Sequence, residues 1–166
     1  MLKKNDLLQI LKSNNIEFSI QEHAPLFTVE DSKSLRGTIR GAHSKNLFLK
    51  DSKGIFYLLS IEENTSIDLK KVAAPINSKK LSFANSKYLQ SIMGIEPGSV
   101  SPFALINDKE KKVKFYLDQS LAAYDIVNFH PLVNTATVSI KSNDLIQFIN
   151  NIHNPVNILN VENCQR

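Results

Sequence analysis

The chain has 166 residues, of which 42% are hydrophobic and 22% charged, a balance typical of one soluble globular domain and not of a disordered segment. No apolar run approaches the roughly 20 residues that a transmembrane helix needs, so we expect a cytoplasmic protein. The net charge of +4 is carried almost entirely by lysine, since Arg36, Arg40 and Arg166 are the only arginines, and it suits an anionic partner such as RNA without requiring one.

Cysteine and histidine content restricts the chemistry. The single cysteine, Cys164, cannot form an internal disulfide and has no neighbouring histidine in the sequence that would make it a nucleophile. The four histidines, His23, His43, His130 and His153, are too scattered to form a metal-binding signature. We therefore expect no metal and no cofactor, although a metal-dependent hydrolase stays open as an alternative.

The first third of the chain predicts a helix, a strand and a second helix. Asn5 can cap a helix whose leucines and isoleucine recur at helical spacing up to residue 14, and residues 18–21 alternate as a strand does. Thr28 and Asp31 resemble a capping box that opens a short helix ending near Gly37. Residues 47–49 and 55–61 are apolar on both faces and flank a turn, so we expect a hairpin of central strands.

The remaining pattern mixes hairpins with helices. Expected helices span residues 68–74, 86–94 (capped by Ser86) and 142–154 (capped by Ser142), and expected strands span 81–83, 100–106, 113–117, 126–129, 135–140 and 156–161. Regular alternation of strands and helices is missing, so the fold class is α+β, with a mixed, largely antiparallel central sheet flanked by helices. Residues 1–161 form one domain, and residues 162–166 are expected to be a frayed polar tail.

The stretch 128–137 gathers polar groups where a strand should end. Alternation places Asn128 and His130 on one face and Phe129 on the other, and Pro131, which lacks a backbone donor, should stop the strand pairing. The stretch is either a hydrogen-bonded structural corner or part of a site. The pattern itself leaves both interpretations open.

Two other segments carry candidate groups. Lys45 directly precedes an apolar strand, where its ammonium is either partly desolvated or reaches into water. Residues 97–102 form a tight turn around Gly98, whose amides are either oxyanion donors or only a helix-to-strand connection. The charges of residues 33–46 are either a rim for phosphates or a solvated surface.

Together these motifs resemble the YbaK and prolyl-tRNA-synthetase-associated editing domains, and among them the free-standing alanyl-tRNA(Pro) deacylases called ProXp-ala or PrdX. The resemblance extends over nearly the whole chain and keeps its motifs in order. It covers His23 with residues 27–30, then residues 44–51, 81–84, 94–103, 105–108 and 128–137.

The resemblance implies an enzyme that hydrolyses the ester linking alanine to mischarged proline tRNA, with no metal or cofactor. It implies that Lys45 is the catalytic residue, which holds the ester and the terminal ribose. The substrate-binding residues that it implies are Asn46, Gly98, Ser99, Val100, Ser101, Pro102 and His130, and we add Thr135 as a further candidate. The partner is the acceptor end of tRNA(Pro) carrying alanine, with prolyl-tRNA synthetase or an elongation factor as further candidates, and we expect a monomer.

A size argument supports such an enzyme. Alanine lacks about two methylenes of proline, which are worth only on the order of 1 to 3 kcal/mol in a pocket, so a synthetase needs a second, smaller pocket to remove the error. We expect Phe103, Leu105 and the wall near His130 and Thr135 to form it. With no serine or cysteine triad, water is the expected nucleophile, and Lys45 and loop amides stabilise the tetrahedral intermediate. A pocket for another small amino acid, such as cysteine or serine, and a noncatalytic tRNA-binding module are the alternatives.

Overall fold

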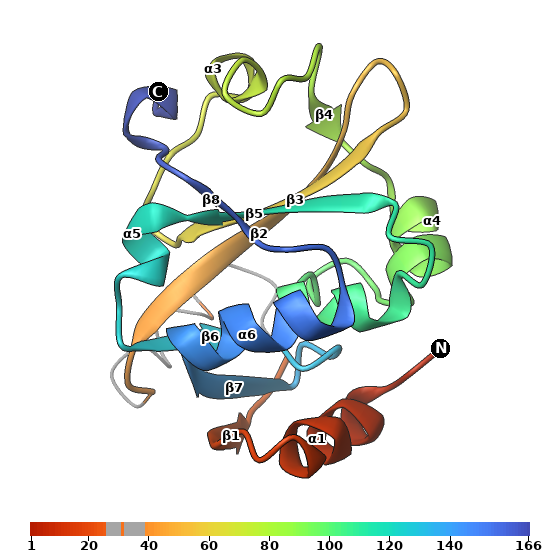
Figure 1. Ribbon diagram of the computed structural model, residues 1–166, viewed down its shortest axis with the longest axis vertical. Helices are drawn as coiled ribbons and strands as arrows, with labels where there is room; N and C mark the ends of the chain where they lie inside the picture. The colour runs from red at the N-terminus through yellow and green to blue at the C-terminus, as the bar shows by residue number, and fades with distance from the viewer. Residues whose placement is uncertain (26–30, 32–38) are drawn as a thin grey trace.

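The computed structural model describes residues 1–25, 31 and 39–166. Apart from Asp31, the helix expected over residues 28–37, with Lys33 and Arg36, lies outside the described residues. The described strands form one eight-stranded sheet in the order β1-β7-β6-β2-β3-β5-β8, with β4 paired to β2 (Figure 1). Their bounds are β1 Phe18–Glu22, β2 Ala42–Lys50, β3 Phe56–Glu62, β4 Ser82–Phe83, β5 Val113–Asp118, β6 Ile126–Phe129, β7 Ala136–Lys141 and β8 Asn157–Leu159.

The sheet is mixed, as predicted. Antiparallel ladders join β1 to β7, β7 to β6, and β2 to both β3 and β4, whereas parallel ladders join β2 to β6, β3 to β5, and β5 to β8. The predicted hairpin of β2 and β3 is confirmed. Asp51 closes its turn, because its carboxylate accepts hydrogen bonds from the backbone N–H groups of Lys53 and Ile55 and from the Tyr57 hydroxyl.

β2 is the strand that positions the candidate site. One edge pairs with β3 along its length, while the other edge pairs with β6 at Ala42 and His43 and with β4 at Leu49 and Lys50. Between these two partners, residues 44–47 form an interval at which no strand of the described chain pairs with this edge. Lys45 and Asn46 both lie in the interval.

Alternation along the strands gives the sheet two separate cores. One face of β2 and β3 presents Phe48, Phe56 and Leu58 to the large core, which is covered by α1 (Lys4–Ser13) and α6 (Ser142–Ile152). The opposite face presents Leu49, Tyr57, Leu59 and Ile61 to a small core beneath α3 (Leu69–Ala73). Burial on both faces explains why residues 47–49 of β2 and 56–59 of β3 are apolar without alternation.

The remaining helical segments are short, and several predicted caps shift by one or two residues. They are α4 Ser86–Tyr88, the π-helical η1 Leu89–Met93, η2 Pro102–Asn107, α5 Gln119–Ala122 and η3 Glu162–Cys164. Asn5 and Ser86 lie inside helices rather than at their caps, which are Lys3 and Asn85, and Ser142 is the first residue of α6. No helix among the described residues is long and apolar enough to cross a membrane.

The prediction of a strand at residues 100–106 is wrong. The segment is the 3-10 helix η2, in which the Ser101 hydroxyl accepts the Phe103 N–H at 3.1 Å and Pro102 occupies the first turn. Its apolar residues are buried on every side, so a continuous apolar run appears there as it would in a buried strand. β5 consequently has no hairpin partner in this segment and pairs with β3 and β8.

The expected fraying of residues 162–166 is also wrong. Cys164 is only 1% exposed and its carbonyl accepts the Asp68 N–H at 2.9 Å, while Gln165 forms a β-bridge with Ile67. The end of the chain therefore covers the small core beside α3 (Figure 1). The sequence is polar there, but Val161 and Cys164 supply buried groups.

Candidate active site

Lys45 is anchored at the middle of the sheet. Its side chain leaves β2 opposite Ile61 of β3, and its ammonium donates a hydrogen bond of 2.5 Å to the Thr65 carbonyl. Burial lowers the pKa of Lys45, and Arg166 lowers this pKa further, while Glu63 acts in the opposite sense. The bond to Thr65 thus fixes the position of the half-buried ammonium. A fixed charge in such a position interacts more strongly with other charges than it would in water.

His130 follows β6 and lies against His23, which follows β1. The His130 Nδ1–H donates to the Ala136 carbonyl at 2.9 Å, and the two imidazole centroids are 6.2 Å apart. Burial lowers the pKa of His130; the bond to Ala136 opposes this shift, and His23 adds to it. The neutral imidazole is therefore favoured, with Nε2 as a hydrogen-bond acceptor.

His23 is a residue that the sequence placed in a motif without giving it a role. Its Nδ1–H donates to the Ala24 carbonyl at 2.8 Å, so its Nε2 accepts the Thr137 hydroxyl at 2.8 Å. Its backbone N–H also donates to the Thr135 carbonyl at 2.9 Å. These bonds bring Thr135 to His23, and the ring contact brings His23 to His130.

The strand register places Lys45 and His130 on the same face of the sheet. The parallel ladder between β2 and β6 pairs His43 with Asn128. Two residues further along each chain come Lys45 and His130, and side chains two residues apart in extended strands point to the same side. The described pairing ends before them, so Lys45 lies inside the unpaired interval of β2 and His130 follows the end of β6 beside it.

Asn46 points to the other face. Its amide donates to the Ser44 hydroxyl at 3.2 Å and its carbonyl oxygen accepts the Ser60 hydroxyl at 2.5 Å, while Ser44 donates to the Asn128 carbonyl at 2.9 Å. This chain of bonds joins β3, β2 and β6. Asn46 therefore acts on the backbone of β2 beside Lys45, and its side chain does not share the face of the ammonium.

Asn128 belongs to a structural corner. Its amide donates to the carbonyls of Arg40 and Ala42, at 2.8 and 3.1 Å, and its side-chain oxygen accepts the Ser139 hydroxyl at 2.5 Å. With 3% exposure, it has its polar groups satisfied inside the protein. The structural interpretation of the 128–137 stretch thus holds for Asn128, whereas His130 presents Nε2 as an acceptor.

The loop 98–102 is built on the large core. Gly98 has a φ of +91°, and a β-carbon added to it would lie 3.5 Å from the Asn134 amide nitrogen, so the loop sits beside the segment that follows His130. The Ser99 N–H already donates to the Glu96 carbonyl at 3.1 Å. The Ser99 amide is therefore engaged within the turn, and an oxyanion role for the loop amides stays a prediction.

The end of this loop is tied to the strand that carries His130. Pro102 and Ser101 are buried, Val100 is half-buried, and Phe103 packs edge-on against Phe129 with ring centroids 6.3 Å apart. Phe103 and Leu105 are fully buried core residues. The loop and His130 are consequently positioned by the same aromatic contact.

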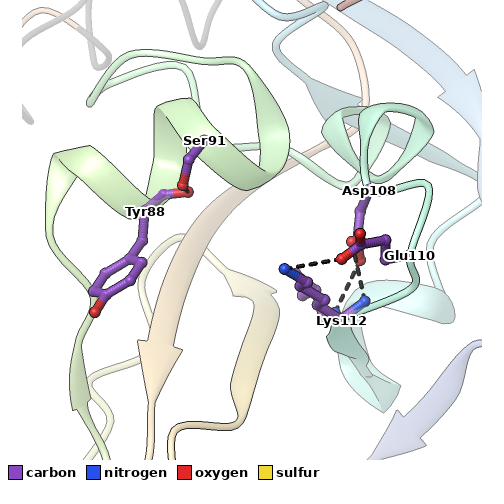
Figure 2. Close-up of polar contacts among 6 residues, drawn as sticks. Tyr88, Ser91, Asp108, Glu110 and Lys112 are labelled. Atoms are coloured by element: carbon purple, nitrogen blue, oxygen red, sulfur yellow. Dashed lines mark hydrogen bonds and ion pairs between the residues drawn. The ribbon is translucent and has the colours of Figure 1, made fainter.

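Two cavities of about 600 and 620 Å³ lie elsewhere, and neither is lined by Lys45, Gly98 or His130. In the first, Ser91 stands opposite Asp108, Glu110 and Lys112, and Figure 2 shows the Lys112 ammonium directed at Glu110 at 2.9 Å. Asp108 accepts bonds from two backbone N–H groups and from His153. Asp108, Glu110 and Lys112 of this cavity thus already have partners within the protein.

Comparison with known proteins agrees with this geometry. Residues 23–148 match the family described as "Aminoacyl-tRNA editing domain". The chain is 34% identical over 147 residues to "Prolyl-tRNA editing protein ProX" of Acetoanaerobium sticklandii, covering 88% of this chain and 90% of that one. It is also 34% identical over 162 residues to "Prolyl-tRNA synthetase associated domain-containing protein 1" of Bos taurus, covering 94% of both.

A solved structure described as a candidate trans-editing enzyme for prolyl tRNA synthetase has the same fold, with a TM-score of 0.73 and 18% identity over 96% of this chain and 97% of that one. The matched region, residues 23–148, contains Lys45, the 98–102 loop and His130. The expectation of an aminoacyl-tRNA hydrolase is confirmed at the level of this family. The chain belongs to the aminoacyl-tRNA editing domain family.

Proposed function

We propose that the chain is a cytoplasmic, monomeric trans-editing enzyme that hydrolyses the ester of mischarged alanyl-tRNA(Pro), with water as the nucleophile. The observation that carries the proposal is the placement of the Lys45 ammonium and the His130 imidazole on one face of the sheet, at the interval where β2 has no partner strand among the described residues. The relatives named for prolyl-tRNA editing favour tRNA(Pro) as the carrier.

The chemistry assigned to the site is direct hydrolysis. Water attacks the ester carbonyl carbon, and the carbonyl oxygen becomes negatively charged in the tetrahedral intermediate. Lys45 stabilises that charge, because its half-buried ammonium is held by Thr65 before the substrate arrives. The intermediate then expels the ribose oxygen, which takes up a proton, and alanine and free tRNA leave.

His130 orients the reactants in this scheme. Because its Nδ1–H is committed to the Ala136 carbonyl, the neutral ring offers Nε2 to a hydroxyl or a water molecule. A substrate ribose hydroxyl supplies further orientation of the water. Lys45 acts through its charge and position, which requires the protonated ammonium rather than a neutral amine.

Specificity comes from size. We assign the wall of the amino-acid pocket to His130, Thr135 and the 98–102 loop. Within this loop, Gly98 lies against Asn134. Asn46 supports the pocket through the backbone of β2. A pocket that takes a methyl group and excludes a pyrrolidine ring removes alanine and spares correctly charged proline tRNA.

The test is single-turnover hydrolysis of alanyl- and prolyl-tRNA(Pro) by the purified protein, with and without a chelator. We expect rapid loss of alanine, stable prolyl-tRNA and no effect of the chelator. Faster hydrolysis of cysteinyl- or seryl-tRNA would assign the pocket to another small amino acid. Binding of tRNA without hydrolysis would show that the protein is a noncatalytic tRNA-binding module.

The relatives named as prolyl-tRNA synthetase associated suggest where the substrate is met. We propose that prolyl-tRNA synthetase releases the mischarged tRNA close to this enzyme, which acts on the acceptor end. Co-sedimentation of the two proteins with and without tRNA(Pro) measures whether the encounter is a stable complex.

A further inference from the structure

The loop of residues 65–67 gathers two cationic side chains that lie 121 positions apart in the sequence. The Thr65 carbonyl accepts the Lys45 ammonium at 2.5 Å, and the Ile67 carbonyl accepts the Arg166 Nε–H at 3.2 Å. The Ser66 carbonyl between them accepts the Arg166 backbone N–H at 3.1 Å. Three consecutive carbonyls therefore bind the Lys45 ammonium, the Arg166 backbone and the Arg166 guanidinium in turn, and the two charges lie close enough to interact electrostatically.

The position of Arg166 is built into the fold. Cys164, 1% exposed, donates its thiol to the Lys71 carbonyl at 3.6 Å, and its carbonyl accepts the Asp68 N–H. The Lys71 ammonium donates to the Gln165 carbonyl at 2.9 Å. These bonds fix the backbone on the N-terminal side of Arg166, and the Nε bond fixes the direction of the guanidinium plane.

Two neighbouring cations oppose each other electrostatically. Arg166 contributes to the lowered pKa of Lys45, while Glu63 offsets only part of the change. Folding would not gain from bringing the two charges together, but an anion would be attracted to both. Arginine is also the side chain best suited to a phosphate, because its planar fork donates two parallel hydrogen bonds.

We propose that Arg166 is a substrate-binding residue that, together with Lys45, contacts the 5′-phosphate of the aminoacylated terminal adenosine. The proposal rests on the proposed function, in which Lys45 holds the ester and the ribose of that same nucleotide. Arg166 is exposed and so accessible to a large substrate, and the phosphate is the anion that a nucleotide presents next to its ribose.

The test compares two minimal substrates, the 3′-alanyl esters of adenosine and of adenosine 5′-monophosphate. The wild-type protein should hydrolyse the phosphorylated ester with the higher kcat/KM. In Arg166→Gln the ratio of the two kcat/KM values should fall by roughly tenfold to a hundredfold, mainly through a higher KM for the phosphorylated ester. Arg166→Lys should restore part of the advantage, and Lys12→Gln, which removes an equal charge from the exposed end of α1, should keep all of it.

Equal loss on both esters in Arg166→Gln, accompanied by a lower Tm, would overturn the proposal in favour of a purely structural role. Failure of the proposed function is distinguished separately by the wild-type protein. If the wild-type protein hydrolyses neither ester nor alanyl-tRNA, the proposed function is wrong. Titration with adenosine 5′-monophosphate then decides the inference. Weaker binding to Arg166→Gln than to Lys12→Gln supports a nucleotide phosphate site, and equal binding overturns it.

Discussion

His23 and His130 come from opposite ends of the matched region and meet with their ring centroids 6.2 Å apart. Each ring donates its Nδ1–H to a backbone carbonyl, that of Ala24 for His23 and that of Ala136 for His130. Nε2 of His23 is already bonded to the Thr137 hydroxyl at 2.8 Å, whereas the bond to Ala136 leaves Nε2 of His130 as an acceptor. His130 thus offers an acceptor at the proposed pocket.

This arrangement predicts a pH dependence of stability. The folded pKa of His130 is lowered, so below its unfolded pKa the unfolded chain binds more protons than the folded one. The contribution of His130 to the free energy of unfolding is therefore fully present above the unfolded pKa, near 6.5. It is lost as the pH falls from that value toward and through the folded pKa. Urea denaturation of the wild type between pH 7.5 and pH 5 should show the loss.

His130→Asn supplies the comparison, because its amide N–H can replace Nδ1–H at the Ala136 carbonyl without titrating in this range. The variant should lose less stability than the wild type over the same pH interval. The same slope in both proteins would assign the pH dependence to other groups.

Removing the Lys45 charge should abolish most of the activity. For Lys45→Ala we expect a fall of about a hundredfold or more in the single-turnover rate on alanyl-tRNA(Pro), since a preorganised charge on the intermediate is lost. Lys53→Ala, in the exposed turn after β2, removes an equal charge away from the site and should be near wild type. A Lys45→Ala rate close to wild type would refute the role of this residue.

Asn46 should contribute mainly to stability. Asn46→Ala breaks the bonds to Ser44 and Ser60 and leaves the fully buried Ser60 hydroxyl without its acceptor, which costs about 1 to 3 kcal/mol. Urea denaturation measures this loss. Adding Ser60→Ala to this variant removes the orphaned hydroxyl, so the double variant should lose less stability than Asn46→Ala alone. A loss of deacylation rate in Asn46→Ala as large as that in Lys45→Ala would instead place the Asn46 amide on the substrate.

Gly98 can be tested against a glycine with similar backbone geometry. Gly98 and Gly54 have φ values of +91° and +82°, so alanine at either position should cost about 1 to 2 kcal/mol of folding free energy. Around Gly54 no atom lies within 4 Å of an added β-carbon, whereas at Gly98 the Asn134 amide lies at 3.5 Å. Thermal unfolding should therefore show similar losses for both variants, and only Gly98→Ala should slow deacylation.

Local patterns were sufficient for much of the fold. The two-sided apolar runs at residues 47–49 and 55–61 became the central pair β2 and β3, and the helical stripe after Ser142 became α6. The ordered motifs around Lys45, Gly98 and His130 also led to the correct family. These features depend on residues that are close together in the sequence, so the sequence is sufficient to predict them.

Tertiary structure decided the features that depend on distant partners. The apolar run at residues 102–107 is buried on every side, so its helical form followed from packing and from Pro102, not from periodicity. The polar residues 162–166 are ordered because Ile67 and Asp68 bind their backbone, and Arg166 approaches Lys45 only through the carbonyls of residues 65–67. The sequence by itself thus determined most of the strands, the two long helices and the family motifs. Only folding decided which charges meet, because an electrostatic contact depends on separation in space and not along the chain.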